Sequence, residues 1–186
     1  GGKVSIGSGA WPGAQGLYLG DAGHIYSVGT NSLYTNQNLY YNSGWKYNGN
    51  SAGTQLSMVG GVVSFSNAPV NSSGAGAAAT LTERLHITAA GDMGLGTNSP
   101  NQKLHLHVAG SGGNKIKFTN DTTATGASDG FTVGIDGSEN AELRLDEATD
   151  MLFVTNSTER LRITSDGKVR VPDNGKFVAG AGDDLQ

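Results

Sequence analysis

Glu83-Arg84-Leu85-His86-Ile87-Thr88-Ala89-Ala90-Gly91-Asp92-Met93 occurs a second time as Glu159-Arg160-Leu161-Arg162-Ile163-Thr164-Ser165-Asp166-Gly167-Lys168-Val169. Each copy predicts a strand with Leu and Ile on one face, then a turn that ends in glycine, then a second strand. The opening residues Gly2-Lys3-Val4-Ser5-Ile6-Gly7 match the second half of this stretch. Self-similarity of this kind indicates stacked modules rather than one closed globule. We interpret the stretch as a hairpin that separates longer β modules.

This interpretation divides the chain into five parts. We expect the end of a preceding hairpin at 1–9, a Tyr- and Trp-rich β module at 10–80, the repeat hairpin with its following strand at 81–108, a second β module at 109–157, and a second hairpin with the start of a next module at 158–186. Within the first module, the small and polar residues 71–80 predict a loop or linker.

Short alternating runs bounded by Gly, Asn, Ser or Asp predict the remaining strands. The pair Gly60-Gly61 between two such runs predicts a two-residue hairpin turn. The expected strands are 16–20, 24–28, 33–35, 38–41, 45–47, 54–59, 62–66, 102–108, 115–119, 131–136, 141–146, 151–155 and 176–179.

The composition favours an all-β protein with essentially no helix. Thirty of the 186 residues are glycine, and only 15% are charged, which suits many short strands joined by tight turns. The formal net charge is −4 and no basic stripe is present, so the sequence lacks the electrostatic signature of nucleic-acid binding. No apolar run approaches the length that spans a bilayer, which argues against membrane insertion.

Cohesion must come from a source other than disulfides, because the chain has no cysteine. Oligomerisation is the alternative for a chain with few large apolar residues. The chain begins Gly-Gly without methionine and stops at Gln186 without a closing element. We therefore expect it to be a piece of a longer polypeptide.

The residues Glu83 to Leu104, with the pattern ERL-x-IT-x-x-G-x-MGLGT-x-SP-x-x-KL, resemble a motif of tail-fibre and related structural proteins of tailed phages, in particular marine and cyanobacterial phages. The usual pattern there is ERMRI-x-x-x-G-x-VGIGT-x-x-P-x-x-KL-x-V, often upstream of a self-cleaving intramolecular chaperone domain. Residues 126–142 and 175–185 are also similar to these fibres. The second copy departs from the pattern, because Arg170-Val171-Pro172-Asp173 stands where Gly-Ile-Gly-Thr is expected.

The resemblance implies an elongated homotrimeric β fibre of the virion without a cofactor. Its partners would be two further copies, other virion proteins, and a polysaccharide or protein receptor on the host surface. Physical reasoning agrees, because short strands broken by glycine leave exposed edges and apolar faces that three chains around one axis would cover. The expected trimer core is Leu85, Ile87, Leu104, Leu106, Leu161 and Ile163.

Two further groups of residues are candidates for ligand binding. His105 and His107 lie on one face of an expected strand; three copies on a threefold axis would offer six imidazoles to a metal ion, a use known from trimeric phage fibres. The alternative is a polar outer face. The aromatic residues between 11 and 47 could stack on sugars, or they could simply fill a β core. The candidate glycan contacts are Trp11, Tyr18, Tyr26, Tyr34, Tyr40, Tyr41, Trp45 and Tyr47.

The most direct hypothesis is therefore a non-enzymatic structural and adhesive segment of a virion fibre. A bacterial extracellular adhesin or surface filament built from the same repeats is the alternative. A polysaccharide depolymerase is a third, but the carboxylates between 136 and 150 specify no catalytic pair, and the spacing of the repeats is too loose for regular β-helix coils.

Overall fold

The computed structural model describes residues 4–8, 15–19, 23–28, 30–176 and 178. All regular elements in this part of the chain are strands, β1 to β17, and none is a helix, which confirms the predicted all-β class. The chain forms two units, residues 1–112 and 113–186. The expected boundaries at 9 and 80 do not coincide with the edge of a sheet, because one sheet of the first unit runs through both.

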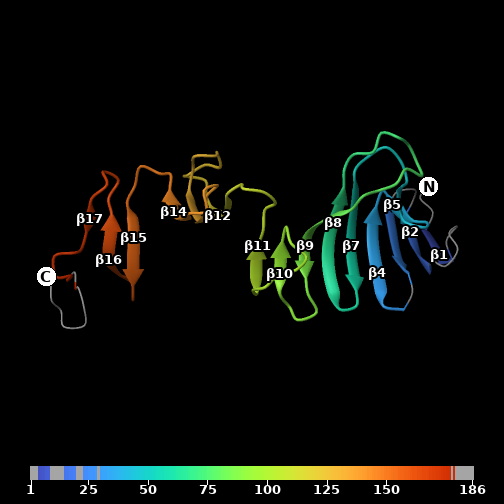
Figure 1. Ribbon diagram of the computed structural model, residues 1–186, viewed down its shortest axis with the longest axis horizontal. Coiled ribbons are helices and arrows are strands. Elements are labelled where there is room, and N and C mark those ends of the chain that lie inside the picture. Colours follow the sequence, from blue (N-terminus) through green and yellow to red (C-terminus); the bar gives the residue numbers. More distant parts are fainter. Residues whose placement is uncertain (1–3, 9–14, 20–22, 29, 177, 179–186) are drawn as a thin grey trace. The chain divides into compact units, whose positions relative to one another are not determined.

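The first unit is built on one nine-stranded sheet and a small hairpin (Figure 1). The sheet order is β1-β2-β3-β4-β7-β8-β9-β10-β11, and all neighbours are antiparallel except β10 and β11, which are parallel. The hairpin β5–β6 pairs separately. The bounds are β1 Val4–Ser8, β2 Gln15–Leu19, β3 Gly23–Ser27, β4 Ser32–Gln37, β5 Leu39–Tyr41, β6 Trp45–Tyr47, β7 Gly53–Val59, β8 Val62–Ala68, β9 Thr82–Ile87, β10 Met93–Leu95 and β11 Leu104–Leu106.

The register of this sheet separates an apolar face from a polar one. Residues paired directly across strands share a face, and alternate residues of a strand point to opposite faces. One row on the apolar face is Thr35, Leu56, Phe65, Leu85, Leu95 and Leu106, and the next is Leu33, Met58, Val63, Ile87, Met93 and Leu104. The polar face carries Tyr34, Ser57, Ser64, His86 and His105.

The predicted turn at Gly60-Gly61 joins β7 to β8. Both glycines have positive φ, 58° and 84°, as a two-residue hairpin that follows the twist of its strands requires. Asn156 and Ser157 take the same left-handed conformation between β15 and β16, with φ of 49° and 56°.

A small core lies between the hairpin and the sheet. Leu39, Tyr47 and Ala68 are buried, and Trp45 packs against them. The segment 71–80, predicted to be a loop or linker, has no regular strand and closes this core. Its backbone bonds to the hairpin through Tyr47 N to Ala77 O at 3.0 Å, Gly76 N to Tyr47 O at 2.9 Å and Ala79 N to Trp45 O at 2.9 Å.

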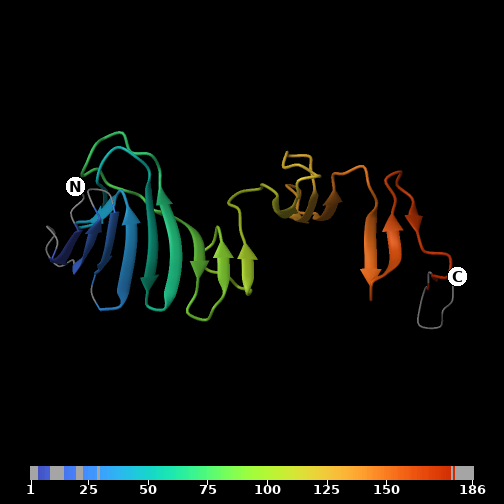
Figure 2. The same ribbon diagram turned by 180° about the vertical axis from the view of Figure 1, so that it is seen from behind.

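The second unit contains two separate three-stranded sheets, both antiparallel (Figure 2). One orders β12-β13-β14 and the other β15-β16-β17. The predicted module 109–157 therefore spans a whole sheet and the first strand of another. The bounds are β12 Asn114–Phe118, β13 Phe131–Ile135, β14 Ala141–Leu145, β15 Met151–Thr155, β16 Thr158–Ile163 and β17 Val169–Arg170. The strand expected at 176–179 is not formed by its described residues, Lys176 and Val178.

The two copies of the repeated stretch share the same backbone hydrogen bonds. Gly91 N donates to Thr88 O at 2.9 Å, and Gly167 N donates to Thr164 O at 2.8 Å. The Thr88 hydroxyl accepts from Asp92 N and the Thr164 hydroxyl from Lys168 N, each at 3.0 Å. Both glycines have positive φ. The first strand of each copy also carries a β-bulge.

The small core gives the first testable expectation. Leu39 is fully buried, so Leu39→Ala should lower the free energy of unfolding by about 2–4 kcal/mol. Urea unfolding followed by the fluorescence of the neighbouring Trp45 measures this. Val70→Ala, at a side chain that is 76% exposed, should change the value by less than about 0.5 kcal/mol. Equal effects of the two variants would contradict the assignment of the core.

Candidate functional site

The main feature of the surface is that the apolar face of each sheet is left open by the described chain. On the first sheet Phe65 is 49% exposed and Leu104 is 49% exposed. On the β12–β14 sheet the apolar face includes Leu143, which is 57% exposed. Among the residues whose burial the structure describes, the buried large apolar side chains are those of the small core and Tyr26. An apolar surface that extends over whole sheets is typical of an interaction site.

The six residues of the expected trimer core all lie on these apolar faces. Leu85, Ile87, Leu104 and Leu106 come together on the first sheet. Leu161 and Ile163 pair with Phe153 and Met151 on the β15–β17 sheet. The rows also contain residues that were not singled out from the sequence, although strand alternation could have found them. These are Leu33, Met58, Phe65, Met93, Leu95, Phe153 and Val169.

The opposite face of the β15–β17 sheet carries an ion-pair network around Arg162. Its Nε donates to Glu159 Oε1 at 2.7 Å, and its Nη1 donates to Asp150 Oδ2 at 2.7 Å. These bonds raise the pKa of Arg162, and the bond to Arg162 holds the pKa of Glu159 below its usual 4.5. In the first copy His86 stands in place of Arg162 and lies 2.8 Å from Glu83. The glutamate of each copy is thus bound within its own chain.

The arginine of each copy lies at the β-bulge, and its role differs from that of the preceding glutamate. In β9 the bulge adds Arg84 between the paired residues Glu83 and Leu85, and Arg84 Nε donates to Asn67 Oδ1 at 2.9 Å. In β16 the bulge adds Arg160, whose Nε donates to Thr155 Oγ1 at 2.9 Å. Since Thr155 lies two residues beyond Phe153, Arg160 reaches the rim of the apolar face.

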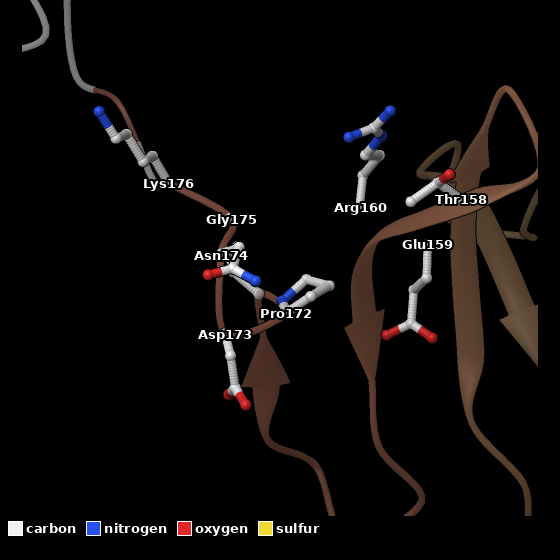
Figure 3. A pocket seen from close by; sticks show the side chains of 9 residues that line it. Thr158, Glu159, Arg160, Pro172, Asp173, Asn174, Gly175 and Lys176 are labelled. Carbon is white, nitrogen blue, oxygen red and sulfur yellow. The ribbon is translucent and has the colours of Figure 1, made fainter.

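A hollow of about 500 Å³ lies beside Arg160 (Figure 3). One wall is β16, with Thr158, Glu159 and Arg160, and the other is the segment 171–176 that follows β17. Gly175 N donates to Pro172 O at 2.6 Å and closes a tight turn in that segment. The turn begins at Pro172-Asp173, which stand at the positions of Gly96-Thr97 in the first copy.

The two histidines of the possible metal site lie together. The rings of His105 and His107 are 6.3 Å apart between centroids, and the buried Nδ1 of His105 has no hydrogen-bond partner among the described residues. His105 is also in register with Gly94 and His86. The residues that the structure describes contain no group of three or more His, Asp or Glu side chains that could hold a metal ion. Metal binding at this pair stays a prediction, and it would need ligands from other copies.

The aromatic candidates separate into buried and accessible side chains. Tyr26 and Tyr47 are each 4% exposed and belong to the interior. Tyr34, Tyr41 and Trp45 form a cluster whose rings lie 5.3 Å apart from Tyr34 to Trp45 and from Trp45 to Tyr41. We call these three residues the aromatic patch. Tyr41 is 42% exposed, and Tyr34, Trp45 and Tyr40 are half-buried.

A buried polar chain lies on the same face of the sheet as the aromatic patch. Gln55 Nε2 donates to Asn36 Oδ1 at 3.0 Å, and Asn36 Nδ2 donates to the Tyr26 hydroxyl at 2.9 Å. His24 Nδ1 lies 2.9 Å from Leu39 O and joins the sheet to the hairpin. Trp11 and the side chain of Tyr18 lie outside the described residues.

Comparison of the chain with models of known families, with curated proteins and with solved structures finds no match. In the described ranges, no helix is long and apolar enough to cross a membrane. The site must therefore be interpreted from its own geometry.

The Arg162 network predicts a pH dependence of stability. A carboxyl group with a lowered pKa contributes stability that is complete above its unfolded value and is lost as the pH falls through the folded value. We therefore expect the thermal midpoint of the wild type to fall as the pH drops below 4.5, the ordinary pKa of Glu159. Arg162→Gln should flatten this fall and lower the midpoint at pH 7. Calorimetry from pH 2.5 to 7 measures both, and identical profiles would contradict the role of Arg162.

Proposed function

We propose that the chain is a structural and adhesive segment of a phage virion fibre, and that it acts as a homotrimer. The observation that supports this most is the open apolar face on each sheet. A second layer must cover such a face in water, and copies of the same chain supply an identical apolar surface. The resemblance of residues 83–104 to fibre proteins supports the virion as the setting.

In the proposed trimer the apolar faces of the three copies turn toward a common axis. Closed cyclic symmetry is the usual outcome when identical chains associate. The residues with ion pairs, such as Glu159 and Arg162, then remain in contact with water, where they keep the fibre soluble. No reaction and no cofactor is needed for this role.

The adhesive part of the proposal concerns the aromatic patch. Tyr34 lies on the face opposite to Phe65 and Leu85, so association through the apolar faces leaves the patch accessible. Aromatic rings beside hydrogen-bonding side chains are suited to the apolar faces and hydroxyls of sugars. We propose a glycan of the host surface as its ligand.

Assembly through the apolar face is tested by a matched pair of substitutions. Leu161→Asp places a carboxylate on the apolar face beside Phe153 and should give monomers or aggregates in place of trimers. Leu152→Asp changes the same residue type on the same hairpin but on the face of Arg162, and it should leave the trimer intact. Sedimentation velocity measures both masses. A monomeric wild type, or a Leu161→Asp variant that remains trimeric, would overturn the proposal.

Glycan contact is tested by Tyr41→Ala, which removes the most exposed ring of the patch. We expect the wild-type trimer to bind members of a bacterial-glycan array and the variant to lose about two- to twelvefold in affinity, because one stacked ring contributes about 0.5–1.5 kcal/mol. Val70→Ala, at an exposed side chain outside the patch, serves as the control. A wild type that binds no glycan, or equal binding by the variant, would contradict this part of the proposal.

A further inference from the structure

The hollow beside Arg160 has a free positive group on one wall. Arg160 uses Nε to bind Thr155 Oγ1, and within the described chain its two terminal nitrogens form no hydrogen bond or ion pair. A guanidinium fixed at Nε presents the remaining donors in a planar fork that matches a carboxylate. The position of the β-bulge directs this fork to the rim of the apolar face.

The other wall carries a free negative group. Asp173 follows the end of β17, is exposed, and makes no ion pair or side-chain hydrogen bond with any described residue. Most other carboxylates of this unit are engaged, for example Glu142 with Lys115, Asp146 with Arg144, and Asp150 with Arg162. Asp173 is thus one of few acceptors left for a partner.

The chain does not join these two groups to each other, although both line the same hollow. Figure 3 shows the guanidinium of Arg160 and the carboxylate of Asp173 directed toward opposite ends of the hollow. Asp173 also lies beside Glu159, Arg162 and Arg170 of the polar face, whereas Arg160 reaches the rim of the apolar face. Two charges of opposite sign that the chain directs apart can each meet the opposite charge of another copy, because the rim of an interface is polar.

We infer that Arg160 of one copy binds Asp173 of the next copy. This inference rests on the proposed trimer. In a closed ring each subunit meets its neighbours through two different patches, so one patch can supply the guanidinium and the other the carboxylate. Three equivalent pairs would then form around the axis. Charge pairs at a rim select the partner and its register more than they add affinity. Here they would fix the register of the second hairpin against the neighbouring copy.

Charge reversal tests the inference. Arg160→Asp and Asp173→Arg should each weaken assembly at least tenfold in the protein concentration at which trimers dissociate, because each places like charges opposite one another. The double variant Arg160→Asp/Asp173→Arg should recover wild-type assembly, which shows that the substitutions do not prevent folding. Sedimentation velocity over a dilution series measures all three.

A mixture of the two single variants, unfolded and refolded together, distinguishes contacts between copies from contacts within one. Opposite charges then meet across two of the three interfaces of a mixed ring only if the pair joins different copies. Restored assembly supports the inference. No restoration means that the pair lies within one chain and overturns it, as do single variants that assemble normally.

Arg170→Asp is the matched control. It makes the same charge change one strand away, in register with Arg162 on the polar face, and should leave assembly unchanged. Failure of the inference is separate from failure of the proposed function. A wild type that does not assemble overturns the trimer itself, whereas a wild type that assembles beside unaffected Arg160→Asp overturns only the Arg160–Asp173 pair.

Discussion

The burial of the apolar sheet faces is the interaction on which the rest of the structure depends, and the described residues of a single chain do not complete it. Strand alternation puts Leu, Ile, Val and Phe side chains on one face of each sheet. A globular domain covers such a face with a second layer. In the part of the chain that the structure describes, the second layer is the hairpin β5–β6, and it covers the polar face of the first sheet. Large apolar side chains such as Phe65, Leu104 and Leu143 are exposed as a result.

The charged residues of the repeated stretch have different roles on the two faces of their sheets. Glu83 and Glu159 are bound within their own chain by His86 and Arg162, and they fix the local geometry of each hairpin. A β-bulge moves the next residue, arginine in both copies, to the rim of the other face. One extra residue in a strand is enough to do this, since a bulge re-aims a side chain without ending the pairing. In the repeated Glu-Arg-Leu the glutamate is therefore paired within the chain, whereas the arginine forms no ion pair with any residue that the structure describes.

The sequence predicted the features that have a simple period. The strands, the glycine turn at 60–61 and the common face of Leu85, Ile87, Leu104 and Leu106 all follow from alternation. The closure of the small core by residues 71–80 could not be predicted, because small residues without a pattern bind there through their backbone. The bulges were also missed, since the pairing across a strand is not visible in one sequence. The expected strand at 176–179 fails because the turn at 172–175 separates it from β17.

The aromatic residues illustrate why composition alone does not locate a binding site. In the sequence they form one group, because tyrosine serves equally as a core residue and as a contact surface. In the structure the polar network through Asn36 and Gln55 fixes Tyr26 in the interior, and Tyr47 is buried in the small core with Leu39 and Ala68. The remaining rings lie where the hairpin ends, on the face that faces away from the apolar rows. If the apolar faces meet at an axis, that position directs the aromatic patch outward on each copy. The apolar faces then serve assembly, and the opposite surface with the aromatic patch serves contact with a ligand.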